Sequence, residues 1–136
     1  MIRPIIKDAL FLGQKSVPAT PDDIPVADDL LDTLRAHSAE CVGMAANMIG
    51  VKKRIIVVDL GEMAMEMFNP RIISHSVPYE AVEGCLSHYG ARSVTRYKNI
   101  KVEWKTRSFQ TRTQTFTGNI AQIIQHEIDH CNGVII

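Results

Sequence analysis

The chain lacks an excess of charge of either sign. Its 15 lysines and arginines balance 15 aspartates and glutamates, which gives a formal net charge of zero. Proteins that bind nucleic acid or an anionic membrane surface through electrostatics carry a basic stripe and a basic balance. We therefore predict no direct binding to nucleic acid or to membranes.

Cysteine is scarce, and its number is odd. The residues are Cys41, Cys85 and Cys131, so at least one stays outside any disulfide framework. Such a chain fits a reducing compartment, where thiols act as ligands or nucleophiles. No run approaches the ~18 apolar residues of a membrane span. Charges interrupt the first eight residues, so no signal peptide is predicted. We expect a cytoplasmic protein.

What is present is the composition of an ordinary globular protein. Apolar residues make up 46% of the 136 residues and charged residues 22%. This length is typical of one domain with one hydrophobic core. We predict a single domain at residues 1–136.

Hydrophobic periodicity predicts two helices with strands between them. Apolar residues three and four apart indicate an N-terminal amphipathic helix at 26–38. A second such pattern spans 119–131, with Gly133 placed for a left-handed C-cap. Between them we predict short strands separated by turns, one turn at Asn69-Pro70, with strands at 54–59, 71–77, 79–87, 93–96, 100–105 and 111–117. The predicted fold class is α+β, with antiparallel strands in small sheets packed around the C-terminal helix.

The late helix carries the pattern His-Glu-x-x-His. Residues four apart lie on one face of a helix, so His126 and His130 can reach one metal ion. Glu127 lies beside them and can accept a proton from a water that the metal activates. By itself the pattern also arises by chance in surface helices with two solvated histidines.

A third ligand candidate is Cys85, in a strand-like segment. A catalytic metal site needs three protein ligands and an open position for water, and one thiolate with two imidazoles supplies that set. Ile123 continues the histidine stripe into the apolar face of the helix, where unpaired polar groups would be costly. Cys131 points about 100° away from His130 and is interpreted as a core residue.

Small residues at 43–46 let another backbone approach closely, as an added substrate strand would. Small apolar residues also simply pack, so this segment is a weak signal when it is taken alone.

Taken together, these segments resemble the peptide deformylase family, which carries three motifs in this order. The matching segments are Cys41-Val42-Gly43-Met44-Ala45-Ala46-Asn47-Met48, Glu83-Gly84-Cys85-Leu86-Ser87 and Gln125-His126-Glu127-Ile128-Asp129-His130. The second and third motifs are complete, and the resemblance covers nearly the whole chain.

The resemblance implies hydrolysis of the N-formyl group from the formyl-methionine of new polypeptides, and hence proximity to the ribosome. It implies that Cys85, His126 and His130 bind Fe(II), with Zn(II) or Ni(II) able to substitute. Glu127 would take the water proton and pass it to the leaving amine, and the Leu86 backbone N–H would face the formyl oxygen.

The resemblance also implies the peptide-binding residues. The peptide would pair as a strand with the backbone around Val42, Gly43 and Gly84, and Ile123 would form a wall of the methionine pocket. Three further residues, Glu83, Arg96 and Asp129, would hold the ligands in place.

The sequence departs from the family pattern in the first motif and in the helix. Cys41 replaces a glycine, and Met48 replaces a glutamine whose amide donates a hydrogen bond to the oxyanion. Asn47 has a donor, but on a strand it would point to the opposite face. Gln122 occupies a position where the family commonly has an apolar pocket residue, so we expect a different side-chain preference.

The loss of the Met48 donor predicts weakened turnover, because one oxyanion donor is worth about 10²–10³ in rate. The alternative hypothesis is a metal- and peptide-binding protein with little or no turnover. A conventional metalloprotease is disfavoured by the cysteine ligand, and a structural zinc site would need a fourth protein ligand.

Overall fold

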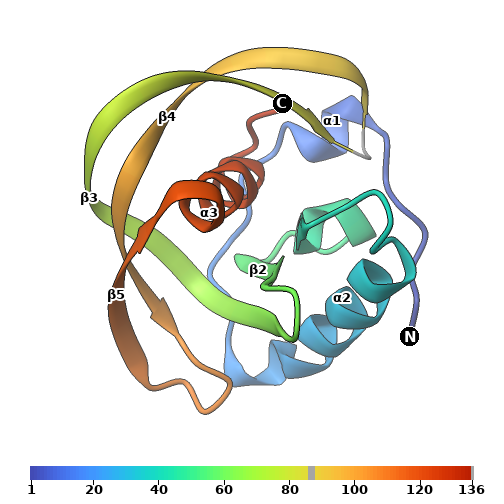
Figure 1. Cartoon of the computed structure of the whole chain (residues 1–136). Coiled ribbons are helices and arrows are strands. Elements are labelled where there is room, and N and C mark those ends of the chain that lie inside the picture. The colour runs from blue at the N-terminus through green and yellow to red at the C-terminus, as the bar shows by residue number, and fades with distance from the viewer. Residues whose placement is uncertain (86–87, 136) are drawn as a thin grey trace.

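The computed structural model describes residues 1–85 and 88–135, with the backbone alone at residues 88 and 89. The elements in chain order are α1 (Ala9–Leu12), η1 (Pro21–Asp23), α2 (Ile24–Ala36), β1 (Gly43–Ala45), η2 (Ala46–Ile49), β2 (Ile55–Asp59), β3 (Ala64–Cys85), β4 (His88–Lys105), β5 (Thr111–Thr117) and α3 (Gly118–Cys131). Figure 1 shows the long ribbons of β3 and β4 curving around α3, with α2 on the far side of β2 from α3.

The five strands form one antiparallel sheet in the order β1-β2-β3-β4-β5. The predicted α+β class is confirmed, but the strands belong to a single sheet rather than to several small ones. The predicted helices at 26–38 and 119–131 correspond to α2 and α3. None of the helices in the described part of the chain has the length and apolar character needed to cross a membrane.

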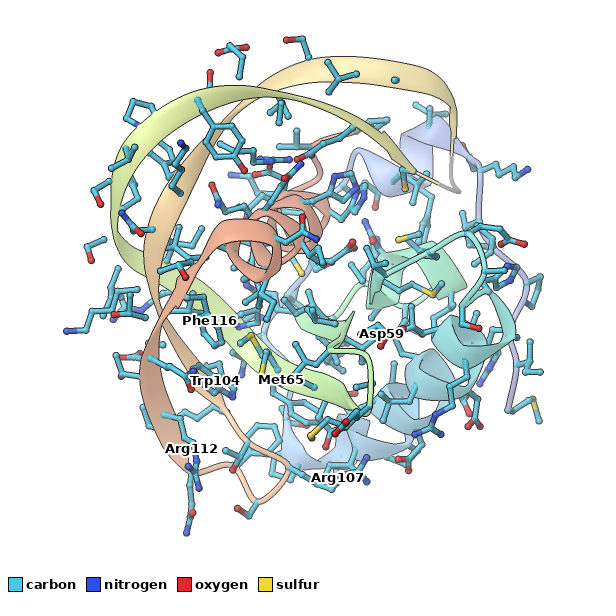
Figure 2. All side chains as sticks on the ribbon, in the orientation of Figure 1. Asp59, Met65, Trp104, Arg107, Arg112 and Phe116 are labelled. Atoms are coloured by element: carbon cyan, nitrogen blue, oxygen red, sulfur yellow. The ribbon has the colours of Figure 1, made fainter. Side chains whose placement is uncertain are left out.

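The apolar run of β2 is explained by cores on both of its faces. Ile56 and Val58 belong to a core under α3, whereas Ile55 and Val57 belong to a core under α2. Alternate residues of a strand point to opposite faces, so a strand covered on both sides is apolar throughout. We call these the α3 core and the α2 core. Figure 2 shows Met65, Trp104 and Phe116 gathered in the first of them.

The prediction of many short strands was wrong for β3 and β4, which are long and continuous. The expected turn at Asn69-Pro70 is an irregularity in β3, where the pairing with β4 shifts register between Phe68 and Arg71. Asn69 adopts a φ of 53° there, and its side-chain amide exchanges hydrogen bonds of 2.7 and 3.0 Å with the backbone of Ala19. Asparagine tolerates the left-handed region, so the strand continues through a bulge.

The left-handed C-cap predicted at Gly133 is present at the end of α3. This residue has a φ of +77°, its N–H donates to the His130 carbonyl at 3.0 Å, and the Val134 N–H donates to the Asp129 carbonyl at 2.9 Å. These two bonds form a Schellman motif, which fixes the last turn of α3 at His130.

Candidate metal centre

The two histidines of α3 face one another at close range. Their Nε2 atoms lie 2.9 Å apart, and the ring planes are inclined by 78°. Cys85, the last residue of β3, places its Sγ 3.4 Å from the Nε2 of His130. Alternate residues of this part of β3 are buried, at Ala81 and Glu83, and Cys85 belongs to the same inward series. The three ligand atoms all lie within 4.8 Å of one another.

The donor types and the distance between Cys85 and His130 fit a single metal ion. Ligand atoms of a tetrahedral zinc site are separated by roughly 3.3–3.6 Å, given metal–nitrogen distances near 2.0 Å and metal–sulfur distances near 2.3 Å. The distance of 3.4 Å from Sγ to Nε2 of His130 lies in this range, and the distance of 2.9 Å between the two Nε2 atoms is shorter. One thiolate and two imidazoles suit first-row metals such as zinc, iron and nickel. Among the side chains that the structure describes, those of residues 1–85 and 90–135, no fourth one joins this group.

A buried carboxylate fixes the tautomer of His126. Glu83 Oε1 lies 2.8 Å from the Nδ1 of His126, so Nδ1 carries a proton, and Nε2, which faces the Nε2 of His130, is the nitrogen available to a metal ion. Arg96 pairs with Glu83 through Nη2 and Nε at 2.7 and 2.9 Å, and with Asp129 through Nη1 at 2.6 Å. Burial opposes ionisation of Glu83, but hydrogen bonds from His126, Arg96 and Gln122 lower its pKa to about 2.

Glu127 lies beside the ligands with one oxygen uncommitted. The residue is 4% exposed, and its Oε1 has no hydrogen-bond partner within the described part of the chain. Burial raises the pKa of Glu127 to about 7, against the lowering effect of nearby His126. A carboxyl group with a pKa near neutrality is suited to accept and return a proton.

Gly43 is required by the close approach of β1 to α3. A Cβ at this position would lie 2.7 Å from Cγ2 of Ile123 and 3.0 Å from Oε2 of Glu127. A larger residue would force the side chain of Ile123 or of Glu127 to shift, so the close packing of β1 against α3 accounts for glycine at this position.

A pocket of about 550 Å³ opens in front of these groups. Its walls include the four residues expected to contact substrate, namely Val42, Gly43, Gly84 and Ile123, together with Cys85, His126 and Glu127. Val42 is 54% exposed, and β1 forms an edge of the sheet. Leu86, expected to supply a backbone N–H, lies outside the described residues.

The expectation for Asn47 was wrong. It lies in the 3-10 helix η2 rather than on a strand, and its buried Nδ2 donates to the backbone carbonyl of His130 at 2.9 Å. Sequence reasoning missed this contact, although Gly50, which ends η2 with a φ of +90°, was a local signal for a turn. Met48, in the same element, lines the pocket and is 1% exposed.

The other two cysteines take no part in the ligand cluster. Cys131 is 1% exposed and packs in the α3 core, as predicted. Cys41 lines the pocket, where its thiol donates to the Gly43 carbonyl at 2.8 Å. Burial raises the pKa of Cys41 to about 12, so its thiol is neutral and a weak nucleophile.

These features define a class: an α+β metallohydrolase with a Cys-His-His site beside a glutamate. The sequence profile described as polypeptide deformylase matches residues 2–136. A peptide deformylase of Clostridium beijerinckii is 55% identical over 136 residues, all of both chains. One from Carboxydothermus hydrogenoformans is 38% identical over 97% of this chain and 84% of its own length.

Solved structures of peptide deformylases have the same fold as this chain. An actinonin-bound class I type b peptide deformylase from Acinetobacter baumannii superposes with a TM-score of 0.89 at 29% identity, covering 99% of this chain and 95% of its own. A peptide deformylase from Legionella pneumophila superposes with a TM-score of 0.89 at 32% identity, and the match covers 99% of this chain and 83% of that one. The chain belongs to the polypeptide deformylase family. Its activity is the metal-dependent hydrolysis of the N-formyl group from the N-terminal formyl-methionine of polypeptides.

Proposed function

We propose that residues 1–136 act as one deformylase domain in which Cys85, His126 and His130 hold one metal ion and Glu127 is the general base. The observation that carries the proposal is the convergence of the three ligand atoms within 4.8 Å of one another, next to a buried carboxylate with an uncommitted oxygen. When bound, the ion acts as a Lewis acid that activates water and polarises the formyl carbonyl.

The protein groups then divide the remaining work. Glu127 accepts the proton of the attacking water and returns it to the amine nitrogen as the C–N bond breaks, which releases formate and a free N-terminus. The edge backbone at Val42 and Gly43 and the backbone at Gly84 pair with the peptide as an added strand. Ile123 walls the pocket for the first side chain, and the Leu86 N–H faces the formyl oxygen.

We propose an N-formyl-methionyl peptide as the partner, met near the ribosome in the cytoplasm, without direct binding to nucleic acid or membrane. A solved deformylase from Acinetobacter baumannii binds Met-Ala-Ser, which supports a short peptide with an N-terminal methionine as ligand. The TM-score of that structure against this chain is 0.88.

We propose that turnover is reduced by Met48, because its thioether cannot donate to the oxyanion. Neighbouring Asn47 does not replace the missing donor, since its amide is directed at the carbonyl of His130. The alternative is a metal- and peptide-binding protein with little or no turnover, which shares every structural feature described above and differs only in kinetics.

Formate release from formyl-Met-Ala-Ser by anaerobically Fe(II)-loaded protein tests this proposal. We expect release above buffer, and a loss of about 10²–10⁴-fold in Glu127→Ala. Peptide binding without formate release would favour the binding-protein alternative. Retention of metal by Cys85→Ala and His126→Ala proteins would reject the ligand assignment.

The proposed metal is Fe(II), with Zn(II) or Ni(II) able to occupy the same ligands. A thiolate next to Fe(II) is prone to oxidation, so we expect the iron form to lose activity in air faster than the zinc or nickel forms. The half-lives of activity of the three metal forms, compared under air and under argon, measure this difference in oxidation. Equal decay of all three would contradict the assignment of Cys85.

A further inference from the structure

Gln122 lies on the pocket-facing side of α3, one turn before His126, and both of its amide ends are engaged. Its Nε2 donates to Oε2 of Glu83 at 2.9 Å, and its Oε1 accepts from the hydroxyl of Tyr79 at 3.2 Å. Tyr79 and Glu83 are four residues apart in β3, so their side chains lie on the same face of the strand. One helical side chain therefore spans two residues of the strand that ends in Cys85.

The carboxylate of Glu83 offers about four lone-pair directions, and each has a partner. Arg96 occupies one on each oxygen in a bidentate pair, His126 takes the second on Oε1, and Gln122 takes the second on Oε2. Glu83 is 8% exposed, so water cannot readily replace a lost donor.

We infer that Gln122 is a positioning residue for the metal ligands. Gln122 and His126 hold the two oxygens of one carboxylate from the same helix face, which fixes the carboxylate plane and the direction of the His126 ring. The same clamp sets the position of α3 against β3, and so brings both histidines to Cys85. Tyr79 acts only through Gln122, by orienting its amide.

This inference rests on the proposed role of Cys85 and His126 as metal ligands. It predicts that Gln122 affects metal binding more than it affects folding, because an isosteric apolar side chain fills the same space but leaves Oε2 of Glu83 with Arg96 as its one remaining donor among the hydrogen bonds described above. Partners of metal ligands are worth 10–100-fold in metal affinity, and we expect a loss in that range.

The test is metal affinity, measured by chelator competition, together with the visible absorption spectrum of the Co(II)-loaded protein, which reports ligand geometry. Gln122→Met should weaken metal binding 10–100-fold and shift the spectrum. Gln114→Met, which changes an exposed glutamine of β5 in the same way, should leave both unchanged. Wild-type affinity and an unshifted spectrum in Gln122→Met would overturn the inference.

Tyr79→Phe provides a second, milder variant, because it keeps the Gln122 donor and removes only the contact that orients it. We expect a smaller loss of affinity, and a Tyr79→Phe/Gln122→Met double variant no weaker than Gln122→Met alone. Additive losses would show that Tyr79 does not act through Gln122. His126→Ala separates the two proposals: if it keeps wild-type metal affinity, the ligand assignment itself fails, whatever the Gln122 variants do.

Discussion

Met48 lies buried beside the pocket, where the deformylase pattern has glutamine, and it also packs in the α2 core. Its side chain contributes apolar burial to the fold. Under the proposed mechanism, it also lacks the hydrogen-bond donor that would stabilise the transition state.

We predict that Met48→Gln raises the rate of formate release by about 10²-fold. It should also lower the free energy of unfolding by about 1–3 kcal/mol, because an amide enters an apolar core. Steady-state kinetics and urea denaturation measure the two effects. Met48→Leu, which changes shape but adds no donor, should give no gain in rate. No gain in Met48→Gln would reject the missing donor as the cause of slow turnover.

Gly43 is a second residue whose effect is local. We predict that Gly43→Ala lowers kcat roughly 10–10²-fold, because the added methyl group would lie 3.0 Å from Oε2 of Glu127 and displace the proposed base. Metal affinity should change less than kcat, since the three atoms nearest to the new methyl group belong to Ile123 and Glu127 and not to the proposed ligands. Wild-type kcat in this variant would show that the carboxylate does not need its present position.

At the scale of elements, the ends of α1 and α3 pack against each other through glycine. A Cβ on Gly133 would lie 2.6 Å from the carbonyl oxygen of Gly13, and the Ser16 N–H donates to the Cys131 carbonyl at 2.8 Å. The last turn of the helix that carries His130 is thus held by the chain that follows α1.

We predict that Gly133→Ala destabilises the protein by about 2–4 kcal/mol, through left-handed backbone strain of about 1–2 kcal/mol and the clash with Gly13. Gly61→Ala is the matched control, since Gly61 has a φ of +99° but no described atom within 4 Å of an added Cβ. Urea denaturation of both variants separates strain from clash. Equal losses would mean that the contact between the two caps contributes nothing.

The long strands show why element boundaries were the least predictable part of the fold. Asn69-Pro70 and Pro78 are turn signals in isolation, yet both lie inside β3. β2 pairs with Ala64–Phe68 of this strand, so beyond Phe68 no other strand in the described part of the chain lies on that side of β3. A proline without an N–H is tolerated at such an edge, and pairing with β4 carries the strand through the local signals.

At the scale of the whole molecule, the ligand cluster joins the end of the long β3 strand to the C-terminal helix. A metal ion bound there ties the two elements together, and binding to the native state alone stabilises that state by mass action.

We predict that removal of the metal by a chelator lowers the Tm by roughly 10 °C, which corresponds to a free metal concentration about 100 times the Kd. Reloading with Zn(II) should restore the Tm. Cys85→Ala should melt at the same temperature with and without chelator. A chelator-dependent Tm in that variant would place the stabilising ion elsewhere.

Features that depend on local periodicity follow from the order of the residues alone. The spacing of His126 and His130 places them on one helix face whatever the rest of the chain does, and Gly133 marks the end of that helix. The apolar run of β2 likewise predicted a buried strand, and the motif order predicted the family.

Contacts between segments distant in the chain arise when the whole chain folds. The meeting of Cys85 with α3, the hydrogen bond from Asn47 to His130 and the clamp of Gln122 on Glu83 all depend on how β3 and η2 lie against the helix. Such positions follow from the packing of two cores and from the register of a long sheet, which no short stretch of sequence encodes. The residue types and their spacing therefore predict the kind of chemistry, whereas the fold provides the geometry that supports it.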